Sequence, residues 1–107
     1  MKIGYLDGPR LRRALIAAFD HVQRRRAELN RINVFPVPDG DTGTNLALTV
    51  STIADRLRAS DHAAIGEVAQ VAADAGVVGA RGNCGMILSH FLLGFAQELK
   101  DRARVSV

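Results

Sequence analysis

The sequence predicts an all-α fold, an antiparallel bundle of about four helices. Four segments carry apolar residues at three-to-four spacing, which is the period of a helix with one buried face. Glycine or proline separates these segments, and no stretch reads as a convincing strand. Hydrophobic residues make up 48% of the chain but aromatic residues only 5%. The core of the bundle is therefore expected to consist mainly of Leu, Ile, Val and Ala.

The first helix is predicted to begin at Asp7-Gly8-Pro9 and to end near Leu29. Aspartate is a common N-cap residue, and proline suits the first helical position. The apolar residues that follow at helical spacing should form one buried face: Leu11, Ala14, Leu15, Ala18, Phe19 and Val22.

Two prolines, Pro36 and Pro38, mark the connection that follows. Each disfavours the helical region for the residue before it, so residues 33 to 41 should be extended or turned. The same prolines argue against a strand at residues 34 to 37, although that stretch is apolar enough for one. A second helix is predicted to begin near Thr44, with an apolar face formed by Leu46, Val50, Ile53 and Leu57.

The third and fourth helices are separated by a glycine-rich stretch. The third is predicted to have a cap at Ser60-Asp61 and to end at Gly76, with an inner face of Ile65, Val68, Ala69, Ala72 and Ala75. The fourth is predicted from about Cys84, and residues 101 to 107 read as a frayed tail. Its apolar stripe is wide, which indicates neighbours on more than one side: Ile87, Leu88, Phe91, Leu92, Phe95 and Leu99.

Size and composition favour one small domain, residues 1 to 107, or part of a larger one. The formal net charge is +3, and the arginine clusters read as a solvated face of the first helix or a surface for an acidic partner. They carry no interleaved aromatics, so nucleic acid is not an expected partner. Cys84 is the only cysteine, which excludes an internal disulfide and favours a reducing cytoplasm. Neither a signal peptide at residues 1 to 8 nor a membrane span is expected.

The segment Asn33-Val-Phe-Pro-Val-Pro-Asp-Gly-Asp-Thr-Gly-Thr-Asn45, here called the acidic segment, is the most informative part of the chain. Asp39 and Asp41 lie one glycine apart, and converging carboxylates usually hold a hard cation such as Mg²⁺ or Ca²⁺. An ordinary turn with Asx-type hydrogen bonds is the simplest alternative. A calcium-binding EF-hand loop is excluded, because Val50 occupies the position that requires Glu. An aspartate-nucleophile phosphohydrolase stays a minor alternative, since its motif ends a buried parallel strand and proline precedes Asp39 here.

A second segment, Gly79-Ala80-Arg81-Gly82-Asn83-Cys84-Gly85, leads into the fourth predicted helix and is here called the glycine-rich segment. Its glycines allow the backbone to approach an anion closely, and a helix N-terminus offers unpaired N–H groups that suit phosphate. Arg81 adds a positive charge, and Asn83 could cap the helix. A tight turn between two helices is an equally good interpretation of this segment taken alone. Together with an acidic metal loop, it indicates a phosphorylated ligand.

Both segments resemble motifs of one family. The acidic segment, preceded by Leu29-Asn-Arg-Ile32, closely resembles the N-terminal signature of bacterial fatty acid kinase catalytic subunits, which belong to the DhaL (Dak2) superfamily of dihydroxyacetone kinases. The glycine-rich segment, extended through Met86-Ile-Leu-Ser89, is similar to the glycine-rich phosphate loop of that family. Two long motifs in the right order make the resemblance specific, and it covers nearly the whole chain.

The resemblance implies part of an antiparallel helical barrel that binds ATP (or ADP) with two Mg²⁺ ions at one end. The implied metal ligands are Asp39 and Asp41, with Asn33 near the third ligand position. No catalytic residue is assigned beyond these ligands. The positions that match the nucleotide-phosphate side of the family site are Thr42, Thr44, Asn45, Gly79, Ala80, Arg81, Gly82, Asn83, Cys84 and Gly85.

The implied reaction is transfer of the ATP γ-phosphoryl group to a fatty acyl carboxylate presented by a separate DegV-type (FakB-like) carrier. A dihydroxyacetone (glycerone) kinase L-type subunit is the alternative within the superfamily, and Thr42 favours the fatty-acid branch over it. Cys84 replaces the usual serine of the family, which removes a hydroxyl but leaves the backbone donors.

The family domain has about twice as many helices as the periodicity predicts here. The chain therefore resembles half of such a barrel, and its open apolar faces should favour a homo-oligomer or a missing C-terminal half. A truncated remnant that binds metal or nucleotide without turnover is the competing functional interpretation.

Overall fold

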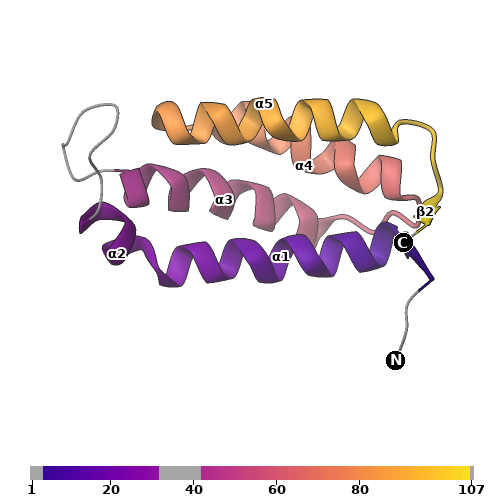
Figure 1. Ribbon diagram of the computed structural model, residues 1–107, viewed down its shortest axis with the longest axis horizontal. Helices are drawn as coiled ribbons and strands as arrows, with labels where there is room; N and C mark the ends of the chain where they lie inside the picture. The colour runs from indigo at the N-terminus through magenta and orange to yellow at the C-terminus, as the bar shows by residue number, and fades with distance from the viewer. Residues whose placement is uncertain (1–3, 32–41, 107) are drawn as a thin grey trace.

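The structure is a computed structural model that describes residues 4–31 and 42–106. Its elements follow the order β1, α1, α2, α3, α4, α5 and β2 (Figure 1). Five helices and one short antiparallel strand pair occupy these residues, so the predicted all-α class is confirmed. The bounds are β1 Tyr5–Asp7, α1 Gly8–Arg24, α2 Arg26–Arg31, α3 Thr42–Ala59, α4 Ile65–Gly79, α5 Gly82–Leu99 and β2 Arg104–Ser106.

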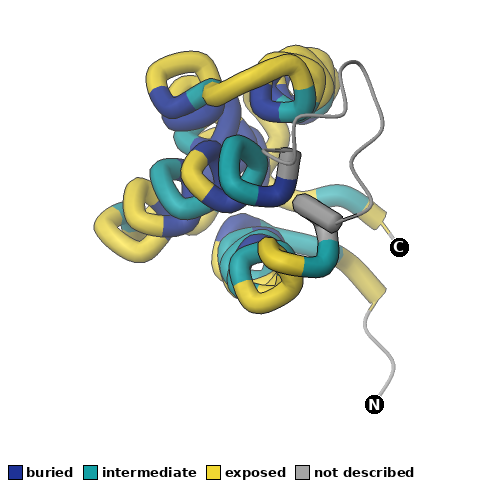
Figure 2. The backbone as a smooth tube through the Cα atoms, turned by 90° about the vertical axis from the view of Figure 1, so that its left-hand side faces the viewer, coloured by how far each residue is buried: buried dark blue, intermediate teal, exposed yellow. Residues whose placement is uncertain are grey.

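Helix α3 lies between the other long helices and contacts α1, α4 and α5. Its predicted apolar residues Val50, Ile53 and Leu57 are fully or almost fully buried. The alanine-rich inner face of α4 packs beside them with almost no exposed surface. This close packing explains a core built from small aliphatic side chains, as the composition predicts. Figure 2 shows the buried residues gathered toward the middle of the molecule and the exposed ones on its outer sides.

The start of α1 is confirmed in detail. Asp7 is the N-cap residue, its carboxylate accepts a hydrogen bond from the Arg10 backbone N–H at 3.1 Å, and a proline lies in the first turn. The predicted single helix to Leu29 is wrong, because the helix is interrupted at Arg25 and a second helix, α2, begins at the next residue. The Arg25 N–H is shared between the carbonyls of His21 and Val22, which tightens the last turn of α1. A hydrogen bond to Glu28 raises the pKa of Arg25.

The connection between α3 and α4 differs from the prediction. Ser60 does not cap α4: its hydroxyl donates to the Leu57 carbonyl at 2.9 Å and so satisfies the end of α3. Helix α4 begins only at Ile65, after an extended Ala64 without a side-chain cap. It also continues past Gly76 to Gly79, because Gly76 is buried against α5 in the helix interior and is not a terminator.

The expected frayed tail at residues 101 to 107 is also wrong. Residues Arg104–Ser106 form β2, which pairs antiparallel with β1 in the register Leu6 to Val105. Leu6 and Val105 both pack against the core cluster. The pairing has no sequence signal of its own, since neither three-residue strand is long enough to show alternation.

One face of α5 is uncovered by the described residues. Leu92 and Leu99 face the core, but Ile87 is 64% exposed and Phe91 65% exposed. Within residues 4–31 and 42–106, α5 packs against both α4 and α3, and the side that carries Ile87 and Phe91 stays exposed. None of the helices in the described ranges has the length and apolar character needed to cross a bilayer.

Candidate functional site

The N-termini of α3 and α5 lie at the same end of the bundle (Figure 1). Helix α3 begins at Thr42, so its first turn is the last part of the acidic segment. Helix α5 begins at Gly82, so its first turn is the last part of the glycine-rich segment. Two segments that end forty positions apart in the sequence, at Asn45 and Gly85, thus end beside each other.

The glycine-rich segment is a very short turn followed by helix. Gly79 is the last residue of α4, Ala80 and Arg81 form the connection, and Gly82 is the first residue of α5. Gly82 has a φ of 67°, a backbone conformation that residues other than glycine rarely adopt. A Cβ at this position would also lie 2.7 Å from the Asn45 side-chain nitrogen. Gly82 therefore both reverses the chain and contacts the first turn of α3.

A polar row on α3 faces the glycines. Asn45, Thr49 and Thr52 follow at four- and three-residue spacing, which places them on one side of the helix. They oppose Gly82, Gly85 and Gly79 respectively, each so closely that an added Cβ would collide with the α3 side chain. The glycines thus allow α3 and the α4–α5 turn to approach closely.

Thr49 makes the only hydrogen bond that is seen in the described ranges between this row and the backbone of the turn. Its hydroxyl donates to the Asn45 carbonyl and accepts from the Arg81 backbone N–H, both at 2.9 Å. The residue has no exposed surface. Sequence reasoning missed Thr49: along this helix it assigned the apolar face and the polar residues of the first turn only. The available signal was the polar spacing from Asn45 through Thr49 to Thr52.

The predicted phosphate-side residues divide between two helix starts. Thr42, Thr44 and Asn45 belong to the first turn of α3, and Gly82, Asn83, Cys84 and Gly85 to the first turn of α5. The expected capping role of Asn83 is wrong, because the N-cap residue is Arg81 and it makes no side-chain capping bond. Asn83 is exposed at the second helical position, and Cys84 is a partly buried free thiol beside it.

The predicted metal ligands Asn33, Asp39 and Asp41 lie outside the described residues. Within the ranges that are described, no group of three or more His, Cys, Asp or Glu side chains could hold a metal ion. A metal site on this chain therefore remains a prediction from the acidic segment, whose last four residues form the start of α3.

The described residues are suited to an anion. The first N–H groups of a helix have no carbonyl partner within it and carry a partial positive charge. At α5 the N-cap supplies no side-chain acceptor, Gly82 has no side chain that would shield the first turn, and Arg81 is exposed beside it. These features fit a phosphate group close to the backbone.

The chain was compared with known proteins. The family model of the DAK2 domain matches residues 36–107, which is more than half of the chain. Protein YloV of Bacillus subtilis is 34% identical over 106 residues, and an uncharacterized protein of Staphylococcus epidermidis strain ATCC 12228 is 31% identical over 105 residues. The matches cover 99% and 98% of this chain but only 19% of each relative.

The chain belongs to the Dak2 family, whose chemistry is phosphotransfer of the kinase type. Members of the family in general bind ADP with magnesium. The 107 residues correspond to about a fifth of the relatives' length, at their N-terminal part.

Proposed function

We propose that the chain forms the metal- and phosphate-binding part of a kinase that transfers the γ-phosphoryl group of ATP. The observation that carries the proposal is the contact between Gly82 and Asn45. It brings the start of α5 against the first turn of α3, directly after Asp39 and Asp41 in the sequence. Membership of a phosphotransfer family supports the same chemistry.

In phosphoryl transfer the protein acts mainly by positioning and by stabilising charge. The N–H groups in the first turn of α5 would donate to phosphate oxygens, and Arg81 would add a fixed positive charge. Asp39 and Asp41, with Asn33, would hold divalent ions. Bound Mg²⁺ would neutralise part of the phosphate charge and would help to orient the leaving group.

We further propose a fatty acyl carboxylate as the phosphoryl acceptor, presented by a separate DegV-type carrier. The support is the likeness of the acidic segment to fatty acid kinases, including Thr42 at a position where dihydroxyacetone kinases differ. A dihydroxyacetone kinase L-type subunit is the competing assignment within the superfamily.

A non-catalytic metal- or nucleotide-binding role is the second candidate. The observation that favours it is the match to only 19% of the length of the relatives. The phosphohydrolase alternative has no support in the described residues. Its nucleophile would end a buried parallel strand, whereas the strands present are a short antiparallel pair at the other end of the bundle (Figure 1).

Calorimetry of the purified chain with ATP, with and without Mg²⁺, tests the nucleotide site. We expect ATP binding to require Mg²⁺ and to weaken at least about tenfold in Asp41→Asn. Mutation of residues that only orient metal ligands already lowers metal affinity by about that factor. Asp61→Asn makes the same charge change in the exposed α3–α4 connection and should leave the affinity unchanged. Binding that is indifferent to Mg²⁺ and to Asp41→Asn would contradict the proposal.

A second assay separates the kinase from the non-catalytic role. The chain is incubated with ATP, Mg²⁺ and a lipid-loaded DegV-type carrier, and acyl phosphate is trapped as the hydroxamate. Formation of the hydroxamate supports the kinase. Nucleotide binding without any acyl phosphate supports the non-catalytic role for this polypeptide.

A further inference from the structure

We propose that Thr49 is a positioning residue for the phosphate-binding turn, an inference that rests on the proposed nucleotide site. Thr49 does not touch the N–H groups expected to face the phosphate. Its hydroxyl instead holds the Arg81 backbone, one residue before α5 begins, and so sets the direction in which the first turn of α5 points.

The Thr49 hydroxyl acts both as a hydrogen-bond donor and as an acceptor. A threonine hydroxyl carries one donor, which is directed to the Asn45 carbonyl within α3 at 2.9 Å. That donation leaves the oxygen lone pairs directed away from α3, where the Arg81 N–H approaches at 2.9 Å. The Asn45 carbonyl lies in the first turn of α3, at the end of the acidic segment. One buried oxygen atom therefore joins the start of α3 to the residue before α5.

The surroundings of Thr49 restrict where this bond can form. A Cβ on Gly85 would lie 2.4 Å from the Thr49 hydroxyl oxygen, so the backbone of α5 passes directly over it. Thr49 has no exposed surface, so its hydroxyl oxygen is held away from water. That oxygen is the acceptor that the Arg81 backbone N–H uses.

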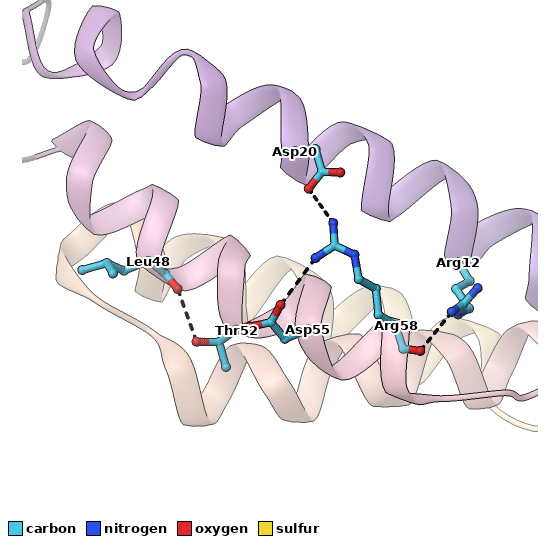
Figure 3. Close-up of polar contacts among 6 residues, drawn as sticks. All are labelled: Arg12, Asp20, Leu48, Thr52, Asp55 and Arg58. Atoms are coloured by element: carbon cyan, nitrogen blue, oxygen red, sulfur yellow. Dashed lines mark hydrogen bonds and ion pairs between the residues drawn. The ribbon is translucent and has the colours of Figure 1, made fainter.

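Thr52 provides a matched control on the same face of α3. Its hydroxyl makes the same bond back to the helix, to the Leu48 carbonyl at 3.3 Å (Figure 3). The Thr52 side chain also lies against Gly79. It accepts no hydrogen bond from the turn among the described residues. Thr52→Val thus removes a comparable hydroxyl, with a comparable change in shape, without changing the support of Arg81.

The test compares Thr49→Val, Thr49→Ser and Thr52→Val in the full chain by amide hydrogen exchange. Valine keeps the shape of threonine, and the Asn45 carbonyl keeps its helical bond from the Thr49 N–H. We expect exchange of the Arg81 N–H to become about fivefold faster in Thr49→Val, the effect of losing one hydrogen bond. Thr49→Ser and Thr52→Val should retain the original rate. Unchanged exchange in Thr49→Val overturns the inference.

Affinity for Mg²⁺–ATP is the second readout. We expect Thr49→Val to bind about fivefold more weakly, with rescue in Thr49→Ser and no change in Thr52→Val. A merely structural role would instead lower the melting temperature of both valine variants without separating their affinities, and that pattern overturns the inference. Absence of ATP binding in the unaltered chain overturns the proposed function, while the exchange measurement still decides whether Thr49 holds the turn.

Discussion

Gly85 and Thr49 illustrate how closely two helices can approach when one side chain is absent. Helix α5 runs over the Thr49 hydroxyl with no room for a methyl group at Gly85. Glycine in a helix interior costs roughly 1 kcal/mol relative to alanine. At this position the cost is offset by the hydrogen bond that the close approach allows between Thr49 and the turn.

Gly85→Ala is expected to destabilise the chain by about 1–3 kcal/mol, the usual effect of overpacking a tight contact. The added methyl group would have to displace Thr49 or the start of α5. Gly94→Ala is the control on the same helix, where a Cβ meets no atom within 4 Å. It should stabilise the chain by roughly 0.5–1 kcal/mol through helix propensity. Urea unfolding measures both, and equal effects of the two substitutions would show that the contact at Gly85 is unimportant.

At the scale of elements, α1 and α3 are joined by arginines that cross between them (Figure 3). Arg58 on α3 reaches Asp20 on α1 at 2.7 Å and also pairs with Asp55. Arg12 on α1 donates to the carbonyls of Leu57 and Arg58, in the last turn of α3. The Leu57 carbonyl also accepts from Ser60, just after the helix, and Arg12 adds a charged donor to both carbonyls, so it acts as a C-terminal cap supplied by a neighbouring helix.

Arg12→Gln is expected to lower the free energy of unfolding by about 1 kcal/mol, because charged donors to the end of α3 are lost. Arg13→Gln changes the same charge on an exposed position of α1 and should alter stability by less than about 0.5 kcal/mol. Thermal unfolding at low and high salt compares the two variants. A similar loss in both would assign the effect to net charge rather than to the cap.

Across the whole molecule, buried and exposed apolar residues are unevenly distributed. The core is enclosed by α1, α3, α4 and α5, yet α4 and α5 also expose several large apolar side chains. The residues concerned are Val77, Val78, Met86, Ile87, Phe91 and Leu93. Large apolar surface left uncovered often marks a contact with another protein segment. The expected homo-oligomer stays a prediction, which a substitution on α5 tests.

Phe91→Lys is expected to weaken self-association of the isolated chain, because a charge replaces an apolar ring that is 65% exposed. Its melting temperature, measured at low protein concentration, should change little. Sedimentation velocity over a range of concentrations measures the association. The control is His21→Lys, the same change at an exposed position of α1, which carries none of these apolar residues, and it should leave association unchanged. A chain that is monomeric at every concentration would contradict the expectation.

Much of this architecture follows from the sequence because its signals are local. Helical periodicity predicts the buried residues of α3 and α4, and Asp7-Gly8-Pro9 predicts the start of α1 through capping geometry. The acidic and glycine-rich segments likewise indicate the family, which the comparisons confirm. The role of Asp39 and Asp41 stays a prediction, since these residues lie outside the described ranges.

Other features depend on contacts between distant residues, which periodicity does not report. The strand pair forms because Leu6 and Val105 reach the same edge of the core. Ser60 satisfies the end of α3 where the sequence favoured the start of α4. Thr49 becomes a support for the turn only because α5 folds back over it. The sequence by itself determined the helices and the family of this protein, whereas tertiary packing decided which polar group meets which backbone, because that choice depends on distances between helices.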